Sequence, residues 1–344
     1  MKRTIRAFLV AACCGTAAVS AQNWAQHGGD AGESRFSPLK QITAANIATL
    51  ATAWTFDLGM SNLQLTPLVV DGVMYVSGAS NVFALEPETG KVLWRFETPA
   101  PVGRRGVAYW PGDGTAGPRV LQPMNDRVIA LDAKTGRLAT NFGGFGWIDL
   151  KHGVRGDRDG RITLITPPVV YKNIIITGSN NEENTPSLGL YGDIRGWDAR
   201  SGKLLWQFHT VPRPGEPGNG TWEGDSWKDR SGTNVWSYFS LDAERGIVYA
   251  PLGVPTSDYY GGDRKGKNLY GNSVVALDAT TGKLQWYQNS ELRTQNSELR
   301  TQASDKRRAS ARERERWRPF GARQAPGLKF RARGSLFNLL PDPS

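Results

Sequence analysis

The segment Ala276-Leu-Asp-Ala-Thr-Thr-Gly-Lys-Leu-Gln-Trp286 is one of four related stretches in the chain. The other three occupy residues 84–94, 130–138 and 197–206. Each runs from an apolar strand end through an acidic residue to a Thr-Gly or Ser-Gly pair and an alternating stretch, which is typical of a tight β-hairpin. Three of the four end in tryptophan. An internal repeat of this kind predicts a fold assembled from similar units.

The sequence before the repeats supports the same interpretation. Residues 68–76, 169–176 and 241–249 each contain two apolar stretches around a polar turn, so each unit is predicted to be a meander of short antiparallel strands. A single such sheet is unstable alone, whereas repeated four-stranded sheets pack radially as blades. We therefore predict an all-β fold, a β-propeller, in which the repeat tryptophans (Trp94, Trp206 and Trp286) pack between blades.

The spacing between the units grows along the chain. The four turn glycines are separated by 46, 66 and 80 residues. This increase indicates insertions between the blades, and inserted loops on one face of a scaffold commonly form binding sites.

The N-terminus has the features of a signal peptide over residues 1–21. It has a basic start, an apolar stretch over residues 7–19 and small side chains at Val19 and Ala21, so the mature chain is expected to be exported. Both cysteines, Cys13 and Cys14, lie in this leader, which predicts a mature protein without disulfides. Alternatively, the small residues before Cys13 resemble a lipoprotein cleavage box, which would leave a lipidated Cys13.

The net charge of +10 is concentrated at the two ends of the chain. The leader contributes +3 and residues 289–344 contribute +7, so residues 22–288 are neutral and nucleic acid is not expected as a partner. A perfect heptad at residues 288–294 recurs at 295–301 and leads into an arginine-rich stretch. We predict that residues 288–344 form a low-complexity, disordered basic tail outside the fold. A basic interaction tail is the alternative.

The repeats resemble the tryptophan-docking motif of PQQ-dependent (quinoprotein) dehydrogenases. The opening Trp24-Ala-Gln-His-Gly-Gly-Asp30 is similar to the start of mature chains in that family, and residues 209–216 and 220–228 resemble its glucose-dehydrogenase branch. The resemblance covers residues 22–287, a partial PQQ-type propeller. It implies eight-bladed relatives that bind pyrroloquinoline quinone (PQQ) and Ca²⁺, and a periplasmic oxidoreductase acting on a sugar or alcohol. The electron acceptor would be cytochrome c or a membrane quinone.

The resemblance also implies four cofactor-binding residues. Arg105 begins an Arg-Gly-Val-Ala-Tyr segment whose arginine binds the cofactor in the family, and its fork of donors suits paired oxygens. Thr166 and Ser179 fall where the family places hydroxyls on the cofactor carboxylates. Trp236 lies near the position at which the alcohol branch stacks an indole, although Val235 takes the gapless place.

Two departures from the family pattern limit the prediction. The family's metal-binding asparagine is replaced in Gly-Val254-Pro, and Asp193 is displaced from the position of a glutamate ligand, so we assign no metal ligand. The catalytic aspartate of relatives follows the strand equivalent to residues 284–287, after which this sequence diverges. We therefore assign no catalytic residue. The expectation is a truncated chain that does not close an eight-bladed ring alone and whose activity is uncertain.

A second class of function stays open. A non-enzymatic propeller resembling the lipoprotein scaffold of outer-membrane assembly would share the repeat and use Cys13 as its anchor. The segment 220–228 and Arg105 favour the dehydrogenase. The histidines, His27, His152 and His209, lack the spacing of a zinc site or a nucleophilic triad, and the Gly-rich residues 112–117 lack the following helix of a nucleotide-binding loop.

Overall fold

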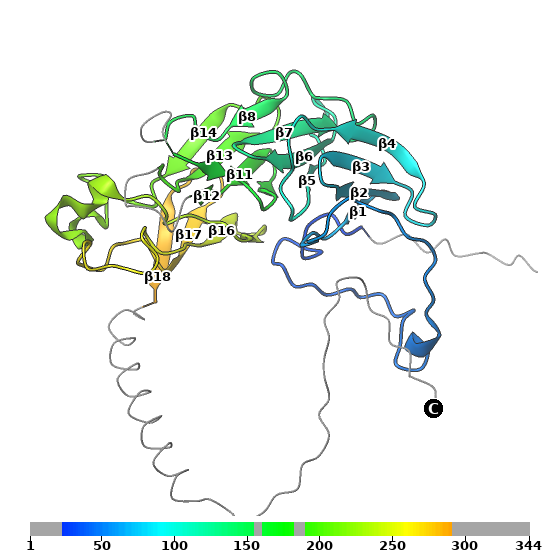
Figure 1. Cartoon of the computed structure of the whole chain (residues 1–344), viewed down its shortest axis with the longest axis horizontal. Helices are drawn as coiled ribbons and strands as arrows, with labels where there is room; N and C mark the ends of the chain where they lie inside the picture. The colour runs from blue at the N-terminus through cyan, green and yellow to red at the C-terminus, as the bar shows by residue number, and fades with distance from the viewer. Residues whose placement is uncertain (1–22, 155–159, 182–189, 291–344) are drawn as a thin grey trace, which may run out of the picture.

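The computed structural model describes residues 23–154, 160–181 and 190–290. Within these ranges the chain forms four antiparallel sheets of four strands each, and the sheets follow one another along an arc (Figure 1). An all-β fold built from four-stranded antiparallel units is therefore confirmed. No helix among the described residues has the length and apolar character needed to cross a membrane.

The strands have the following bounds. The first sheet contains β1 (Leu68–Val70), β2 (Val73–Ser77), β3 (Asn81–Leu85) and β4 (Val92–Glu97). The second contains β5 (Ala108–Trp110), β6 (Arg119–Met124), β7 (Arg127–Asp132) and β8 (Trp147–Asp149). The third contains β10 (Val169–Tyr171), β11 (Ile174–Thr177), β13 (Ile194–Asp198) and β14 (Leu204–Phe208). The fourth contains β15 (Ser240–Asp242), β16 (Ile247–Pro251), β17 (Ser273–Asp278) and β18 (Leu284–Asn289).

The remaining elements lie in the connections between strands. A short pair joins β9 (Ile162–Thr163) to β12 (Asn180–Asn181). Three 3-10 helices, η1 (Ile47–Thr49), η2 (Asn219–Thr221) and η3 (Glu223–Asp229), are the helical elements of the described chain. The last two belong to the long excursion between β14 and β15, which the growing repeat spacing predicts.

Three of the predicted hairpins are the turns between β3 and β4, β13 and β14, and β17 and β18. In the turns after β7, β13 and β17, an aspartate side chain accepts hydrogen bonds from the backbone N–H groups that follow it, whereas in the turn after β3 the Glu86 carboxylate accepts from the Thr89 hydroxyl. Asp278, for example, accepts from the N–H groups of Thr280 at 2.9 Å and Thr281 at 2.8 Å. This arrangement satisfies donors that the sheet ladder leaves open, as expected for aspartate in turns.

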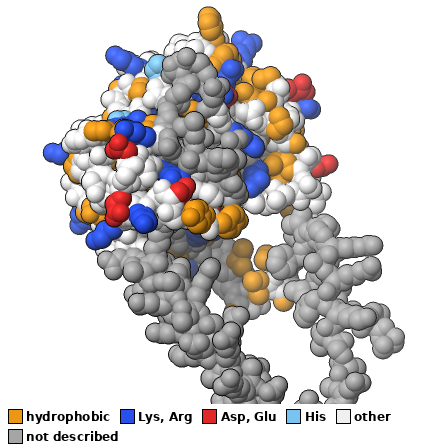
Figure 2. All heavy atoms as spheres, turned by 60° about the vertical axis from the view of Figure 1, so that its left-hand side comes forward, with side chains coloured by type: hydrophobic (Ala, Val, Ile, Leu, Met, Phe, Trp, Pro, Cys, Tyr) orange, Lys and Arg blue, Asp and Glu red, His pale blue; other side chains and the backbone are white. Residues whose placement is uncertain are grey.

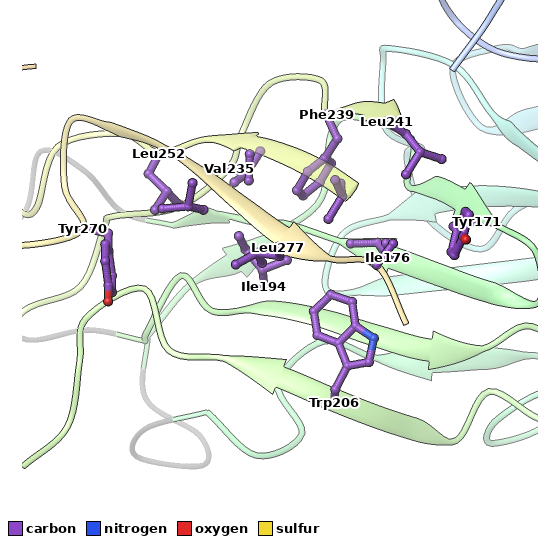
Figure 3. Packing of buried hydrophobic residues seen from close by; sticks show 14 of the residues in the cluster. Tyr171, Ile176, Ile194, Trp206, Val235, Phe239, Leu241, Leu252, Tyr270 and Leu277 are labelled. Atoms are coloured by element: carbon purple, nitrogen blue, oxygen red, sulfur yellow. The ribbon is translucent and has the colours of Figure 1, made fainter. Parts of the chain in front are cut away.

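Apolar side chains fill the space between adjacent sheets. Between the third and fourth sheets, Ile176, Ile194 and Trp206 meet Leu241 and Leu277 in one cluster (Figure 3). Every residue of β6 and of β11 is buried, because these inner strands have a sheet against both faces. Burial of both faces stabilises each sheet, which would be marginal in isolation.

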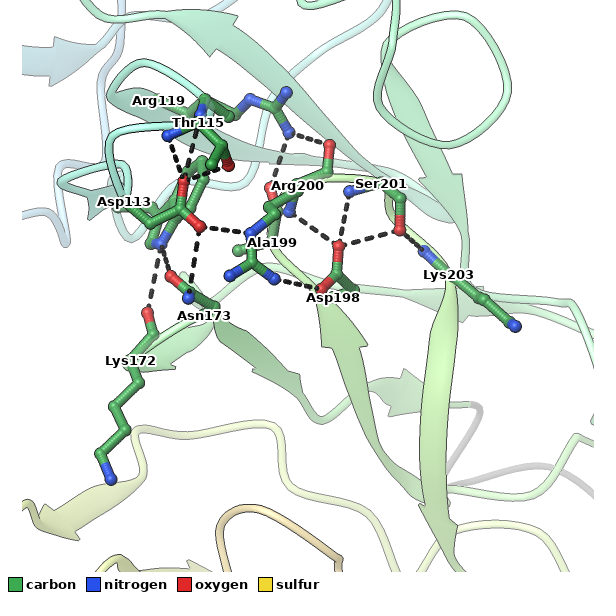
Figure 4. A network of polar contacts seen from close by, with 12 residues as sticks. Asp113, Thr115, Arg119, Lys172, Asn173, Asp198, Ala199, Arg200, Ser201 and Lys203 are labelled. Atoms are coloured by element: carbon green, nitrogen blue, oxygen red, sulfur yellow. Dashed lines mark hydrogen bonds and ion pairs between the residues drawn. The ribbon is translucent and has the colours of Figure 1, made fainter.

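A polar network also joins the second sheet to the third. Arg119 of β6 donates to the carbonyls of Ala199 at 2.6 Å and Arg200 at 2.7 Å, and Arg200 pairs with Asp113 (Figure 4). Hydrogen bonds from Thr115 and Ala116, followed by that from Arg200, hold the pKa of Asp113 well below its usual range. The two sheets are therefore fixed by directional bonds as well as by apolar contact.

A tryptophan lies on the turn glycine of a sheet that follows it in the chain, and two of the three such tryptophans come from a repeat. We call this contact the tryptophan–glycine joint. The three pairs are Trp54 with Gly90, Trp94 with Gly136, and Trp206 with Gly282. At each of these glycines a Cβ atom would overlap the indole, and two of the indoles also donate to a turn carbonyl, Trp94 to Ala133 at 2.9 Å and Trp54 to Pro87 at 3.0 Å. The predicted packing of Trp94 and Trp206 between sheets is confirmed.

Trp286 differs from its counterparts. It was predicted to pack between blades, but its side chain is 47% exposed and no turn glycine of the described chain lies against it. The reason is its place on β18, the last strand of the fourth sheet, beyond which the described residues contain no further sheet.

The end of the folded region lies slightly beyond the position predicted from the sequence. Strand β18 continues to Asn289, two residues past the predicted boundary, because Gln288 and Asn289 pair with Val274 and Ser273. Asn289 also donates from Nδ2 to Gly271 O at 2.8 Å. The predicted signal peptide, residues 1–21, lies outside the described residues, and so does the predicted disordered tail apart from residues 288–290.

The described part of the chain does not concentrate charge of one sign on the face seen in Figure 2. Lys and Arg side chains are interspersed there with Asp, Glu and hydrophobic side chains. This distribution agrees with the neutral sum for residues 22–288.

The tryptophan–glycine joint can be tested with two glycine variants that share a left-handed backbone. Gly282 has φ +70° and faces Trp206, whereas Gly72 has φ +77° and open space. Gly72→Ala should lower the free energy of unfolding by about 1–2 kcal/mol, the cost of the backbone conformation. Gly282→Ala should lower it by about 2–5 kcal/mol, because overpacking adds to that cost. Urea denaturation measures both, and equal losses would contradict the joint.

Candidate functional site

The loop between β4 and β5 positions Arg105. Its backbone N–H donates to Ile165 O at 3.2 Å, which holds the loop against the residues before β10. From there Nη1 donates to Thr166 Oγ1 at 3.0 Å and to Trp236 O at 2.6 Å, while Nε donates to Gln64 Oε1 at 3.2 Å. The guanidinium therefore joins three segments that are far apart in the sequence.

Trp236 lies beside this guanidinium, in the segment before β15. Its ring centroid is 5.2 Å from Arg105 Cζ, and its side chain is 41% exposed. Thr166, which is buried, donates from Oγ1 to Trp236 O at 2.7 Å, so Arg105, Thr166 and Trp236 form a closed triangle of hydrogen bonds. Val235 is buried against Gly178, whereas the ring of Trp236 is accessible. Of these two neighbouring residues, only Trp236 can therefore contact a ligand through its side chain.

Ser179 is joined to the same segment through the backbone. Its N–H donates to Val235 O at 3.0 Å, and its carbonyl accepts from Asn234 Nδ2 at 2.8 Å. All four residues proposed from the sequence are thus brought together. Arg105, Thr166 and Trp236 are hydrogen-bonded to one another, and Ser179 is hydrogen-bonded to Val235, the residue before Trp236.

Several buried polar atoms in this region have no partner within the described chain. They are Ser179 Oγ, Thr233 Oγ1 and Asn234 Oδ1. An unpaired buried polar group costs about 1–3 kcal/mol, so a cluster of them indicates a place where a polar ligand completes the bonding. Thr233 and Asn234 are not among the residues predicted from the sequence, because burial of a polar side chain without a partner is visible only in three dimensions.

The electrostatics of the site favour an anionic ligand. Burial lowers the pKa of Arg105 below its ordinary value, while the neighbouring Tyr238 opposes the shift, and an arginine remains protonated under all ordinary conditions. Tyr238 donates to Arg105 O at 3.2 Å and stacks on His27. Burial raises the pKa of Tyr238 to about 12, so this support stays neutral. The triangle therefore carries one fixed positive charge.

The same region does not supply a donor set for a divalent cation. Val254 has no oxygen in its side chain, and its carbonyl accepts from Thr233 N at 3.2 Å. Asp193 is fully buried, and its oxygens accept from Gln207 Nε2 at 2.7 Å, Thr210 N at 3.1 Å and Arg213 Nη2 at 3.3 Å. Across the described ranges, no three His, Cys, Asp or Glu side chains are grouped to hold a metal. The Asp193 carboxylate thus forms an ion pair with Arg213.

This chain belongs to the PQQ dehydrogenase family. Residues 24–290 match the family profile described as the glucose/ethanol/alcohol dehydrogenase β-propeller domain. The match contains all four sheets and every residue of the candidate site.

Similar proteins carry related names. Quinoprotein glucose dehydrogenase A of Acinetobacter calcoaceticus is 32% identical over 303 residues, covering 78% of this chain and 38% of the relative. Quinohemoprotein alcohol dehydrogenase ADH-IIG of Pseudomonas putida is 32% identical, covering 77% and 38%. The crystal structure of quinohemoprotein alcohol dehydrogenase from Comamonas testosteroni matches with a TM-score of 0.66 and 31% identity, over 78% of this chain and 41% of that one. The chain thus spans about two-fifths of the length of these relatives.

The internal ion pair at Asp193 can be tested against an exposed one. Asp193→Asn leaves the partly exposed Arg213 without its counter-ion and weakens the acceptor of Gln207 and Thr210, so it should lower the free energy of unfolding by about 1–3 kcal/mol. Asp225→Asn, which removes an exposed pair with Lys228, should leave stability unchanged.

The double variant Asp193→Asn with Arg213→Met should recover part of the loss, since no uncompensated charge remains. Chemical denaturation of the four proteins measures this. Equal effects of the two single substitutions would show that Asp193 is not part of a buried pair.

Proposed function

We propose that this chain binds PQQ and works as part of a dehydrogenase that oxidises a sugar or an alcohol. The observation that carries the proposal is the triangle of Arg105, Thr166 and Trp236 beside buried polar atoms without partners. Family membership and the names of its relatives support the same class of reaction.

Each residue has a defined task in the proposal. Arg105 binds a carboxylate or paired oxygens of the cofactor through charge-assisted hydrogen bonds. Trp236 offers an accessible aromatic face to a planar ring, and the unpartnered Ser179 and Thr233 hydroxyls can donate to further oxygens. When bound, PQQ supplies the electron-accepting quinone to which hydride from the substrate carbon is transferred.

The proposal contains no bound cation and no general base. The family expectation of Ca²⁺ is not carried over, because Val254 offers no side-chain oxygen and Asp193 is paired with Arg213. No residue of the described chain is assigned as the base that takes the substrate proton.

The setting of the activity is also a proposal. The basic and apolar first 21 residues favour export to the periplasm, where the electrons would pass to cytochrome c or a membrane quinone. The alternative function, a non-enzymatic propeller scaffold, requires no cofactor. It therefore predicts that the site does not bind PQQ.

Titration with PQQ tests the proposal. Quinone absorbance and tryptophan fluorescence should both change saturably, since Trp236 lies in the site. Arg105→Ala should weaken binding about 10- to 100-fold, the loss expected for hydrogen bonds to a charged group. The matched control is Arg104→Ala, because this exposed neighbour donates only to Gln64 among the described contacts.

Two results would count against the proposal. Wild-type chain that shows no saturable change would favour the scaffold. Equal weakening by the Arg105 and Arg104 variants would show that positive charge alone, and not the triangle, attracts the quinone.

A further inference from the structure

The segment of residues 24–35 connects the first sheet to the fourth, and we call it the N-terminal strap. At its start, Trp24 and Val69 of β1 exchange backbone hydrogen bonds of 2.7 and 2.9 Å. Further along, Ala31 O accepts from Leu241 N of β15 at 2.7 Å. The strap is therefore anchored on two sheets, and the residues between these anchors are held at both ends.

The strap holds His27 in one orientation. His27 Nδ1 is 2.7 Å from Glu33 Oε2, and the other oxygen of that carboxylate accepts from Gly28 N at 3.2 Å. A Cβ atom on Gly28 would lie 2.5 Å from Glu33 Cα, so the strap folds closely back on itself here. The His27 and Glu33 side chains are 10% and 20% exposed. The imidazole is thus fixed by contacts within its own segment.

His27 supports Tyr238, which in turn supports Arg105. The imidazole lies flat against the Tyr238 ring, with ring centroids 3.5 Å apart and planes inclined by 15°. The Tyr238 hydroxyl donates to Arg105 O at 3.2 Å, while Arg105 N donates to Ile165 O at 3.2 Å. Both polar groups of the Arg105 backbone are therefore held. The direction in which the guanidinium enters the triangle depends on both of these bonds.

A cavity of about 450 Å³ lies beside this series of contacts. His27, Glu33 and Tyr238 line it, together with apolar side chains of β1, β5 and β10. Side chains that face a cavity lack close packing on that side, so the ring stack and the hydrogen bonds have the larger part in fixing their positions. The cavity also gives a small molecule room to enter beside the Tyr238 ring.

We propose that His27 and Tyr238 are positioning residues for the PQQ site. The strap presents His27 to Tyr238, and Tyr238 holds the Arg105 backbone so that the guanidinium meets the oxygens of the cofactor. The inference rests on the proposed function, because it names what preorganises that same site. Preorganisation lowers the ordering cost of binding, so its loss weakens affinity even when every group that contacts the ligand is retained.

The positioning can be measured first in the full chain without PQQ. Fluorinated tryptophan gives a fluorine resonance for Trp236, identified by its disappearance in Trp236→Phe. Arg105→Ala should shift this resonance, because Arg105 Cζ lies 5.2 Å from the ring centroid. Tyr238→Phe and His27→Ala should also shift it, although Arg105 is still present. The matched control Tyr109→Phe removes the same atom from another cavity-lining tyrosine and should leave the resonance unchanged.

Titration with PQQ then measures what the positioning contributes to affinity. Tyr238→Phe should weaken binding about 3- to 10-fold, the size expected for the loss of one hydrogen bond. His27→Ala should weaken it similarly, and added imidazole should restore it, since imidazole can enter the cavity and stack on Tyr238. Imidazole should not restore Tyr238→Phe, in which the missing group is the hydroxyl. A role in stability alone predicts no such selective rescue.

These measurements separate the positioning from the proposed function. An unchanged Trp236 resonance in Tyr238→Phe, weakening by Tyr109→Phe equal to that by Tyr238→Phe, or a His27→Ala variant that imidazole does not restore would overturn the positioning. Tyr238→Phe decides it even if loss of His27 unfolds the chain. Wild type that does not bind PQQ would instead reject the proposed function, and the resonance measured without PQQ would still decide the positioning.

Discussion

The contact between an indole and a glycine without a side chain sets how the first sheet meets the second and how the third sheet meets the fourth. A tryptophan is large enough to span the gap between two sheets, and the glycine lets its ring lie directly on the turn. The ring nitrogen can then donate to a turn carbonyl, as Trp94 does to Ala133. One contact therefore fixes both the distance and the orientation of neighbouring sheets, and the apolar clusters between them fill the space that it sets.

The candidate site depends on this framework. Arg105 comes from the loop between the first and second sheets, Thr166 precedes the third, and Trp236 precedes the fourth. No single sheet contains the site. The three residues meet because the sheets bring their connecting loops together. The site residues lie in these loops and not in the strands.

The sequence predicted the elements better than it predicted their partners. The repeat identified the hairpins, because the turn chemistry of Asp, Thr and Gly is local. It also placed Trp94 and Trp206 between sheets. It did not identify Trp54 as a third docked indole, because that residue lies outside any repeat. The prediction that Trp286 packs between sheets was wrong for the described chain, in which this side chain is 47% exposed. Such packing needs an adjacent sheet, and the sequence of the repeat does not say whether one is present.

The polar residues of the site illustrate the same limit. Arg105 and Thr166 were recognisable from a family motif, but Asn234 and Thr233 became candidates only when their burial without partners was known. Asp193 looked like a displaced ligand. Its actual partner, Arg213, lies 20 residues later in a Pro- and Gly-rich excursion, and no spacing rule relates the two.

The long reach of the Arg105 side chain has a consequence for the order in which the protein is made. Its bond to Trp236 O joins residues 131 positions apart. During synthesis the first two sheets can form before the third and fourth have left the ribosome, since each sheet is local in sequence. The triangle is complete only when residue 236 has emerged and its segment has settled. A nascent chain is therefore unable to capture a ligand at this place until most of its framework has been built.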